Sequence, residues 1–219
     1  MRIYKYKSTF LTILVCMMGI FSKSTAQNVM ASIFCETFDG TGDIGGNDGV
    51  FSSYGAISFP IRFDNDGWKM KKINGGANCI RLGNSSGSLF SYITTPAIPV
   101  NAGNLTLSFD AALWNTCKYT TLNIKKTLDG NNSNWKNIAI TKGSFSTIQK
   151  QFSAITSGSL NLTFDNALTT SKNSYFFIDN IIVYQDNASD EQQQKAQRII
   201  LSGNFTQKDV NSLNKNLSK

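Results

Sequence analysis

Apolar and polar residues alternate in short runs along the middle of the chain. In residues 105–113 the odd-numbered positions are apolar and the even-numbered ones are polar or small, and residues 120–125 and 160–165 alternate in a similar way. Residues 175–184 are almost continuously apolar. Alternation with a period of two predicts strands that bury one face, and the apolar run predicts a strand covered on both faces.

Stretches rich in glycine, asparagine and serine separate these runs. The clearest are residues 101–104, 129–133 and 157–158. Short strands joined by such turns predict an antiparallel β-sandwich over about residues 33–185. A domain of about 150 residues buries roughly two thirds of its unfolded surface, and a hydrophobic content of 41% supplies the side chains for that core.

The composition changes after residue 186. Residues 189–201 have helical composition, Ser189 stands where a helix N-cap is expected, and Gly203 follows. Residues 206–209 resemble a capping box that opens a second short helix. Each helix has one thin apolar stripe and would be marginal alone. We therefore expect one domain over residues 27–187, followed by a helical tail over residues 188–219 that packs on the sandwich or on a partner.

The first 26 residues have the pattern of a secretory signal peptide. Three basic residues precede an apolar run from Phe10 to Phe21, and small residues stand at positions 24 and 26. The apolar run is about 12 residues long, which is too short to span a bilayer. We expect the mature chain to begin at Gln27, to have no membrane span, and to be secreted or at the cell surface, in the periplasm or outside the cell.

The basic net charge of +7 does not indicate nucleic-acid binding. Four of the 21 basic residues lie in the first 26 positions, which hold no acidic residue, so 17 basic residues stand against 14 acidic ones in the rest. The one tight basic cluster is Lys69, Lys71 and Lys72. Its near period-two spacing is typical of a solvated strand face rather than of a nucleic-acid-binding stripe.

The residue types also argue against catalysis. The chain has no histidine, which removes the commonest general base and the commonest neutral metal ligand. Its two glutamates, Glu36 and Glu191, stand near opposite ends of the mature chain, so a glycosidase site with paired glutamates is not expected. No glycine-rich phosphate loop follows a strand into a helix. We expect a protein that is not an enzyme.

Three cysteines remain after the signal peptide, Cys35, Cys79 and Cys117. An odd number allows at most one intramolecular bridge. A Cys35–Cys79 bridge is the first choice, because both residues adjoin predicted strands. It would close a loop of about 45 residues, worth about 4 kcal/mol in the chain-entropy model. The alternative is that all three are small buried thiols that fill the core.

Trp114, Tyr119 and Trp135 are candidates for a sugar-binding platform. Sugar rings present apolar C–H faces, which stack on flat aromatic side chains that have hydrogen-bonding neighbours. Asp110 shares a predicted strand face with Trp114 and supplies such a neighbour. The alternative is ordinary packing, because tryptophan is usually well buried.

Seven short motifs in a fixed order resemble a known group of modules. They are the segments 36–39, 45–49, 67–68, 79–83, 94–97, 105–109 and 177–181. Together they resemble the jelly-roll modules of cell-surface and secreted proteins in host-associated Gram-negative anaerobes, near the cleaved-adhesin, choice-of-anchor and carbohydrate-binding-like families. The resemblance implies an all-β, antiparallel jelly-roll β-sandwich of the galactose-binding-like type with a short C-terminal helical tail.

The resemblance also implies a structural Ca²⁺. By their positions in the motifs, Glu36 and Asp179 would be its ligands, since calcium takes carboxylate oxygens. The alternative is that both side chains only hydrogen-bond buried backbone at the seam of the sandwich. For function, we expect a non-catalytic binding module whose partner is a carbohydrate. The alternative is an adhesive or structural protein that acts through contacts with a surface protein.

Overall fold

The structure is a computed structural model that describes residues 30–42, 44–52, 61–83, 90–117, 120–166 and 175–202. The expected signal peptide and the second short helix, which would open at residues 206–209, lie outside these residues. Within them, no helix is both long and apolar enough to cross a membrane.

Two antiparallel sheets form the body of the protein. The first sheet has the order β10-β7-β12-β4-β3, with β1 also paired to β12. Its strands are β1 (Ala31–Glu36), β3 (Ile73–Gly76), β4 (Cys79–Leu82), β7 (Gly103–Leu113), β10 (Ser146–Ile155) and β12 (Phe176–Gln185). The second sheet has the order β2-β5-β11-β8-β9, with β6 also paired to β11. Its strands are β2 (Lys69–Lys71), β5 (Tyr92–Thr94), β6 (Ile98–Val100), β8 (Thr121–Leu128), β9 (Asn131–Ala139) and β11 (Gly158–Asp165).

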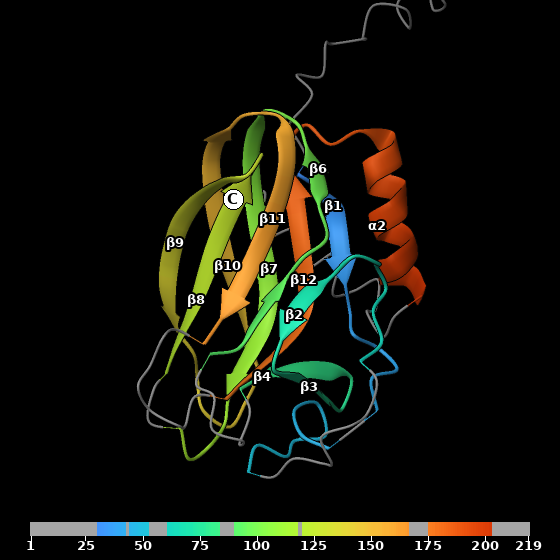
Figure 1. The fold of residues 1–219 in the computed structure, drawn as a ribbon. Coiled ribbons are helices and arrows are strands. Elements are labelled where there is room, and N and C mark those ends of the chain that lie inside the picture. Colours follow the sequence, from blue (N-terminus) through green and yellow to red (C-terminus); the bar gives the residue numbers. More distant parts are fainter. Residues whose placement is uncertain are drawn as a thin grey trace, which may run out of the picture.

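The core lies between the two sheets. Alternation along β7 turns Leu105, Leu107 and Phe109 into it, and alternation along β11 does the same for Leu162 and Phe164; all five are fully buried. The rings of Phe109 and Phe164 meet edge to face across the two sheets, with their centroids 5.2 Å apart. The structure therefore confirms the predicted antiparallel jelly-roll β-sandwich (Figure 1).

The helix α2 (Asp190–Ser202) packs beside β1, as Figure 1 shows at the edge of the molecule. Its capping box is formed. The backbone N–H of Gln192 donates to Ser189 Oγ at 3.3 Å, and the Ser189 N–H donates to Gln192 Oε1 at 2.9 Å. Ala196 of α2 is buried against Cys35 and its neighbours on β12. The first part of the expected helical tail is thus a helix that rests on the sandwich.

A second segment covers the outer face of the first sheet near β4. The loop of residues 44–52 places Phe51 edge to face on Phe177 of β12, with ring centroids 5.6 Å apart. Gly46 of the same loop forms an isolated bridge with Ala77. This loop and α2 together occupy much of the outer face of the first sheet.

The expected bridge between Cys35 and Cys79 is not formed in the structure. Cys35, Cys79 and Cys117 are free thiols, all of them buried, and burial raises the pKa of each. Cys35 packs under α2, whereas Cys79 belongs to the main core cluster and has its Sγ 3.5 Å from the carbonyl oxygen of Gly45. The two thiols therefore lie in different packing clusters, which corresponds to the core-filling alternative.

Candidate functional site

Trp114, the centre of the expected sugar platform, packs inside the protein. Only 6% of its surface is exposed. Its ring stacks on Phe177 at an interplanar angle of 8° and lies 5.3 Å from the Tyr175 ring. The Arg81 guanidinium lies 5.7 Å from the same ring. With so little of the ring exposed, the geometry corresponds to the packing alternative for Trp114.

Of the other residues expected at that platform, the structure describes the side chain of Asp110 alone. Asp110 lies on β7, where its carboxylate accepts hydrogen bonds from Thr147 Oγ1 at 2.6 Å and from Asn180 Nδ2 at 2.8 Å. Tyr119 lies outside the described residues, and so does the side chain of Trp135, whose backbone belongs to β9. The described residues therefore contain no platform built from this set.

The Glu36 carboxylate accepts hydrogen bonds from the segment of residues 64–68, which packs beside it. Its Oε1 accepts the backbone N–H of Asp64 at 2.7 Å, and its Oε2 accepts from the Asn65 backbone, the Asn65 amide and the Trp68 indole at 3.2, 3.1 and 3.0 Å. Burial raises the pKa of Glu36 to about 7, although the hydrogen bonds from Asp64 and Asn65 act to lower it. This matches the alternative in which Glu36 hydrogen-bonds buried groups at the seam.

Asp179 lies in a different setting. Its carboxylate accepts from Asn47 Nδ2 at 2.7 Å and from the Asn180 backbone at 2.8 Å. Burial raises its pKa to about 7, and the negative charges of Asp110 and Asp39 add to the rise.

These contacts bear on the expected calcium site. Among the described residues, no group of three or more Asp, Glu, Cys or His side chains is arranged to hold a metal. N–H donors face both oxygens of Glu36, which matches the hydrogen-bonding alternative, and calcium at Glu36 stays a prediction. Calcium at Asp179 stays a prediction.

The outer face of the second sheet carries a different group of polar side chains. Cross-strand partners point to the same side of a sheet, and two rows of partners run across the strands. The first row is Lys71, Tyr92, Asp165, Asn123 and Asn137. The second row is Lys69, Thr94, Thr163 and Lys125. We call this surface the Asp165 face.

The side chains between these rows show which way the face points. Ile93, Phe164 and Ile124 lie between the two rows on β5, β11 and β8, and all three are buried in the core. The rows therefore point away from the core. In Figure 1 the strands β2, β8 and β11 form the layer nearest the viewer, and no helix of the described residues lies over them.

Hydrogen bonds and one ion pair hold the polar groups of this face in place. Lys125 Nζ lies 2.7 Å from Asp165 Oδ2, and the Asn123 amide donates to Asp165 Oδ1 at 3.1 Å. Thr94 and Thr163 share a hydrogen bond of 2.8 Å between their hydroxyls. Asn123 Oδ1 is buried and accepts no hydrogen bond from the described part of the chain.

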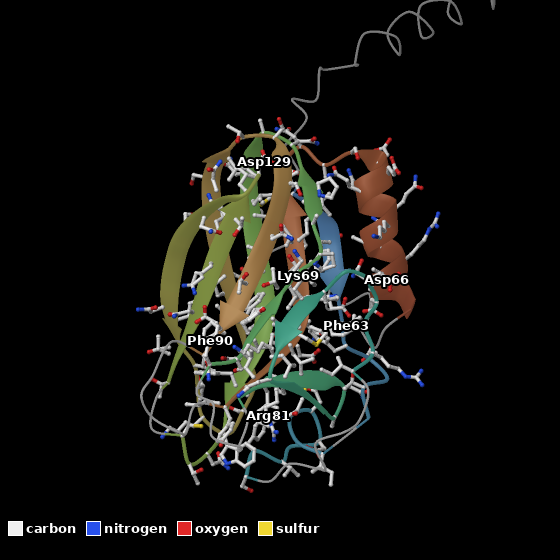
Figure 2. All side chains as sticks on the ribbon, in the orientation of Figure 1. Phe63, Asp66, Lys69, Arg81, Phe90 and Asp129 are labelled. Atoms are coloured by element: carbon white, nitrogen blue, oxygen red, sulfur yellow. The ribbon has the colours of Figure 1, made fainter. Side chains whose placement is uncertain are left out.

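Aromatic rings border these polar groups. The rings of Phe90 and Tyr92 lie 5.7 Å apart and are tilted by 40°. Lys125 Nζ lies 5.8 Å from the centre of the Phe90 ring, which suits a cation–π contact. Figure 2 shows Phe90 near the end of β11 and Lys69 on β2. The Asp165 face thus joins flat apolar rings to fixed donors and acceptors.

One feature of the sequence could have indicated this polar face. Asn161, Thr163 and Asp165 stand opposite the core positions of the run 160–165. The partners on β5, β8 and β2 follow from strand register, which the sequence does not reveal.

A groove of about 410 Å³ lies between α2 and the sandwich. Its lining includes Ile33 and Phe34 of β1, Pro99 of β6, and Lys195 and Ile199 of α2. Gln192 spans part of it, since its amide donates to the Pro99 carbonyl at 2.7 Å. The groove is lined by apolar side chains with a few charged ones.

No protein-family model and no curated protein matches the chain. The structure is similar to the xylan-binding domain CBM22-1 of Xyn10C from Paenibacillus barcinonensis, at 11% identity and a TM-score of 0.47, with 74% of this chain and 98% of that domain covered. It is also similar to TmCBM61, solved in complex with β-1,4-galactotriose, at 12% identity and a TM-score of 0.40, with coverages of 55% and 89%.

A third similar structure is an enzyme, a cyclase from Fischerella sp. TAU. It is 15% identical with a TM-score of 0.38, and the match covers 52% of this chain and 66% of the cyclase. Binding modules and an enzyme therefore appear together among the similar structures. At these identities the matches do not identify a ligand for this chain.

Proposed function

We propose that the protein is an exported, non-catalytic glycan-binding module and that the Asp165 face binds the glycan. The observation that carries the proposal is the pair of cross-strand rows on the outer face of the second sheet, bordered by the rings of Phe90 and Tyr92. A sugar offers both hydroxyl groups and flat C–H faces. The Asp165 face offers a partner for each.

The polar groups on this face are positioned before any ligand arrives. Asp165 is fully buried as a residue, and its two carboxylate oxygens are directed by Lys125 and Asn123. Groups already held in place lose little conformational entropy on binding, which favours affinity.

The two most perturbed carboxyl groups do not suggest catalysis. Glu36 and Asp179 have pKa values raised to about 7, in the range that a general acid uses. Both, however, are buried and hydrogen-bonded to protein donors. They also lie on β1 and β12 of the first sheet, away from the Asp165 face. Burial raises both pKa values and protein donors already bind both carboxylates, so neither group needs a catalytic role to explain it.

A glycan array tests the proposal, with the exported chain from Gln27 compared with two variants. Tyr92→Ala removes a ring of the face, and Thr163→Val removes a hydroxyl while keeping the shape. We expect Tyr92→Ala to weaken the binding of glycans that the wild type captures by at least about tenfold, or 1.4 kcal/mol. Thr163→Val is expected to weaken it less.

Thr147→Val is the matched control, because Thr147 is a strand threonine on β10 of the first sheet. It is expected to bind as the wild type does, and melting temperatures check that all variants are folded. An array without any bound glycan would overturn the proposed function. Binding that survives in both face variants would move the site away from the Asp165 face.

The groove beside α2 favours a second candidate function, adhesion through a protein partner. Its apolar lining on β1 and α2 is the kind of surface that accepts a partner's side chains. An empty glycan array, together with saturable binding of a purified surface protein that Lys195→Glu abolishes, would support this function instead.

A further inference from the structure

Two lysines stand at one border of the Asp165 face. Lys69 pairs with Thr94, and Lys71 pairs with Tyr92. Both side chains therefore point to the same side as the ring of Tyr92. They are exposed, as is the whole of β2, and they lie two residues apart on one strand, which separates them by about 7 Å.

These two positive charges have no acidic partner in the part of the chain that the structure describes. The ion pair found there joins Lys125 to Asp165 and neutralises the only carboxylate in the two rows. The Asp165 face therefore carries two uncompensated positive charges, both on β2 beside the ring of Tyr92. A neutral sugar gives these charges nothing to bind.

We propose that the ligand of the Asp165 face is an anionic glycan, whose carboxylate or sulfate groups are bound by Lys69 and Lys71. The inference rests on the proposed glycan-binding function and names its substrate class. A sugar ring stacked on Tyr92 places its substituents next to Lys71, and the next ring along the row of Thr94 and Thr163 reaches Lys69. Lysine binds such groups through charge and through its three N–H donors.

A different role for the same lysines is protection of a sheet edge. The strand β2 stands at one end of the second sheet, and exposed lysines on edge strands prevent pairing with other chains. Edge protection requires only that the residues are charged and solvated. Glycan recognition requires that they distinguish anionic from neutral sugars, and this difference can be measured.

The test uses two pairs of polysaccharides, and within each pair an anionic and a neutral member share the same sugar backbone. One pair is polygalacturonate and its methyl ester, which tests carboxylates; the other is dextran sulfate and dextran, which tests sulfates. We expect at least one anionic member to bind about tenfold or more tightly than its neutral partner at low salt. Screening of exposed charges should reduce that preference as salt rises.

The double variant Lys69→Gln/Lys71→Gln is expected to lose most of this preference and to bind the neutral partner as the wild type does. Lys142→Gln/Lys150→Gln is the matched control, because it removes the same charge from residues outside the two rows. Equal affinity for the anionic and neutral members of a pair overturns the inference but agrees with the proposed function. So does an equal loss in the two double variants, which would mean non-specific attraction. Absence of binding to all four polysaccharides also overturns the inference, whereas the glycan array decides the proposed function.

Discussion

The substitution Gly46→Ala tests how the loop of residues 44–52 rests on the first sheet. Gly46 has a φ of +96°, which side chains rarely adopt. A methyl group at this position would collide with Cys79 Sγ and would lie 3.2 Å from Cδ1 of Phe177. Alanine therefore meets both backbone strain and a blocked space.

Two other glycines separate these effects. Gly49 also has a positive φ, of +80°, but a methyl group there meets nothing within 4 Å. Gly42 has no such φ and also has open space around it. Backbone strain costs about 1–2 kcal/mol, and overpacking adds about 1–3 kcal/mol. We expect a loss of about 2–5 kcal/mol for Gly46→Ala, about 1–2 kcal/mol for Gly49→Ala, and no loss for Gly42→Ala.

Equilibrium unfolding in urea, followed by circular dichroism, measures these differences. A slope of about 2 kcal/mol per molar urea converts a difference of about 2 kcal/mol between Gly46→Ala and Gly49→Ala into about 1 M in the midpoint. Cys79→Ala then makes room for the new methyl group. In that background, the cost of Gly46→Ala is expected to fall by at least about 1 kcal/mol, as contacting residues couple by amounts of this size.

Equal midpoints for Gly46→Ala and Gly49→Ala, with no change in the Cys79→Ala background, would refute the reasoning. In that case Gly46 would not pack closely against Cys79. The cover that this loop gives to the outer face of the first sheet would then be in doubt as well.

Three further predictions concern buried groups. The pKa values of Glu36 and Asp179 are raised to about 7 from ordinary values of 4.5 and 3.8, so the folded state binds protons more tightly than the unfolded state. The free energy of unfolding should therefore fall as the pH rises from about 5 to 8. Urea unfolding across this range measures the fall, which Asp179→Asn should reduce. Calcium is expected to raise the melting temperature above that in chelator, by an amount that Asp179→Asn removes, whereas equal values would dismiss calcium. The three cysteines should all react with a thiol reagent after denaturation without reductant, because all three are free; a single reactive thiol would mean a bridge.

The sequence predicted the core strands well because their pattern encodes which side is buried. The even positions of 160–165 became the buried face of β11, as the odd positions of 105–113 did for β7. The interpretation of the basic cluster as a solvated strand face is confirmed for Lys69 and Lys71, since β2 is exposed throughout, whereas Lys72 lies just after β2 and is partly buried. Each of these predictions needed only one strand at a time.

Trp114 shows what reasoning from one strand at a time does not predict. The alternation predicted that it points to the same side as Asp110, but not what lies on that side. Phe177 and Arg81, which pack against the Trp114 ring, come from β12 and β4. A neighbour so distant in sequence is set by strand order, and strand order was not predicted. The same reason explains why the rows of the Asp165 face were missed.

The Asp165–Lys125 pair is expected to contribute little to the stability of the fold. Asp165 is fully buried, while the Lys125 side chain is 39% exposed. Taking a carboxylate out of water costs several kcal/mol, and its ion pair often does no more than offset that cost. Apolar residues of similar size would therefore commonly give the same stability or more. On the first sheet, α2 and Phe51 pack against the outer face. On the second sheet a buried charge is instead held by Lys125 and Asn123 at the centre of two polar rows. Under the proposed function, the pair has a further effect, because Lys125 neutralises a carboxylate that would otherwise repel an anionic glycan bound by Lys69 and Lys71.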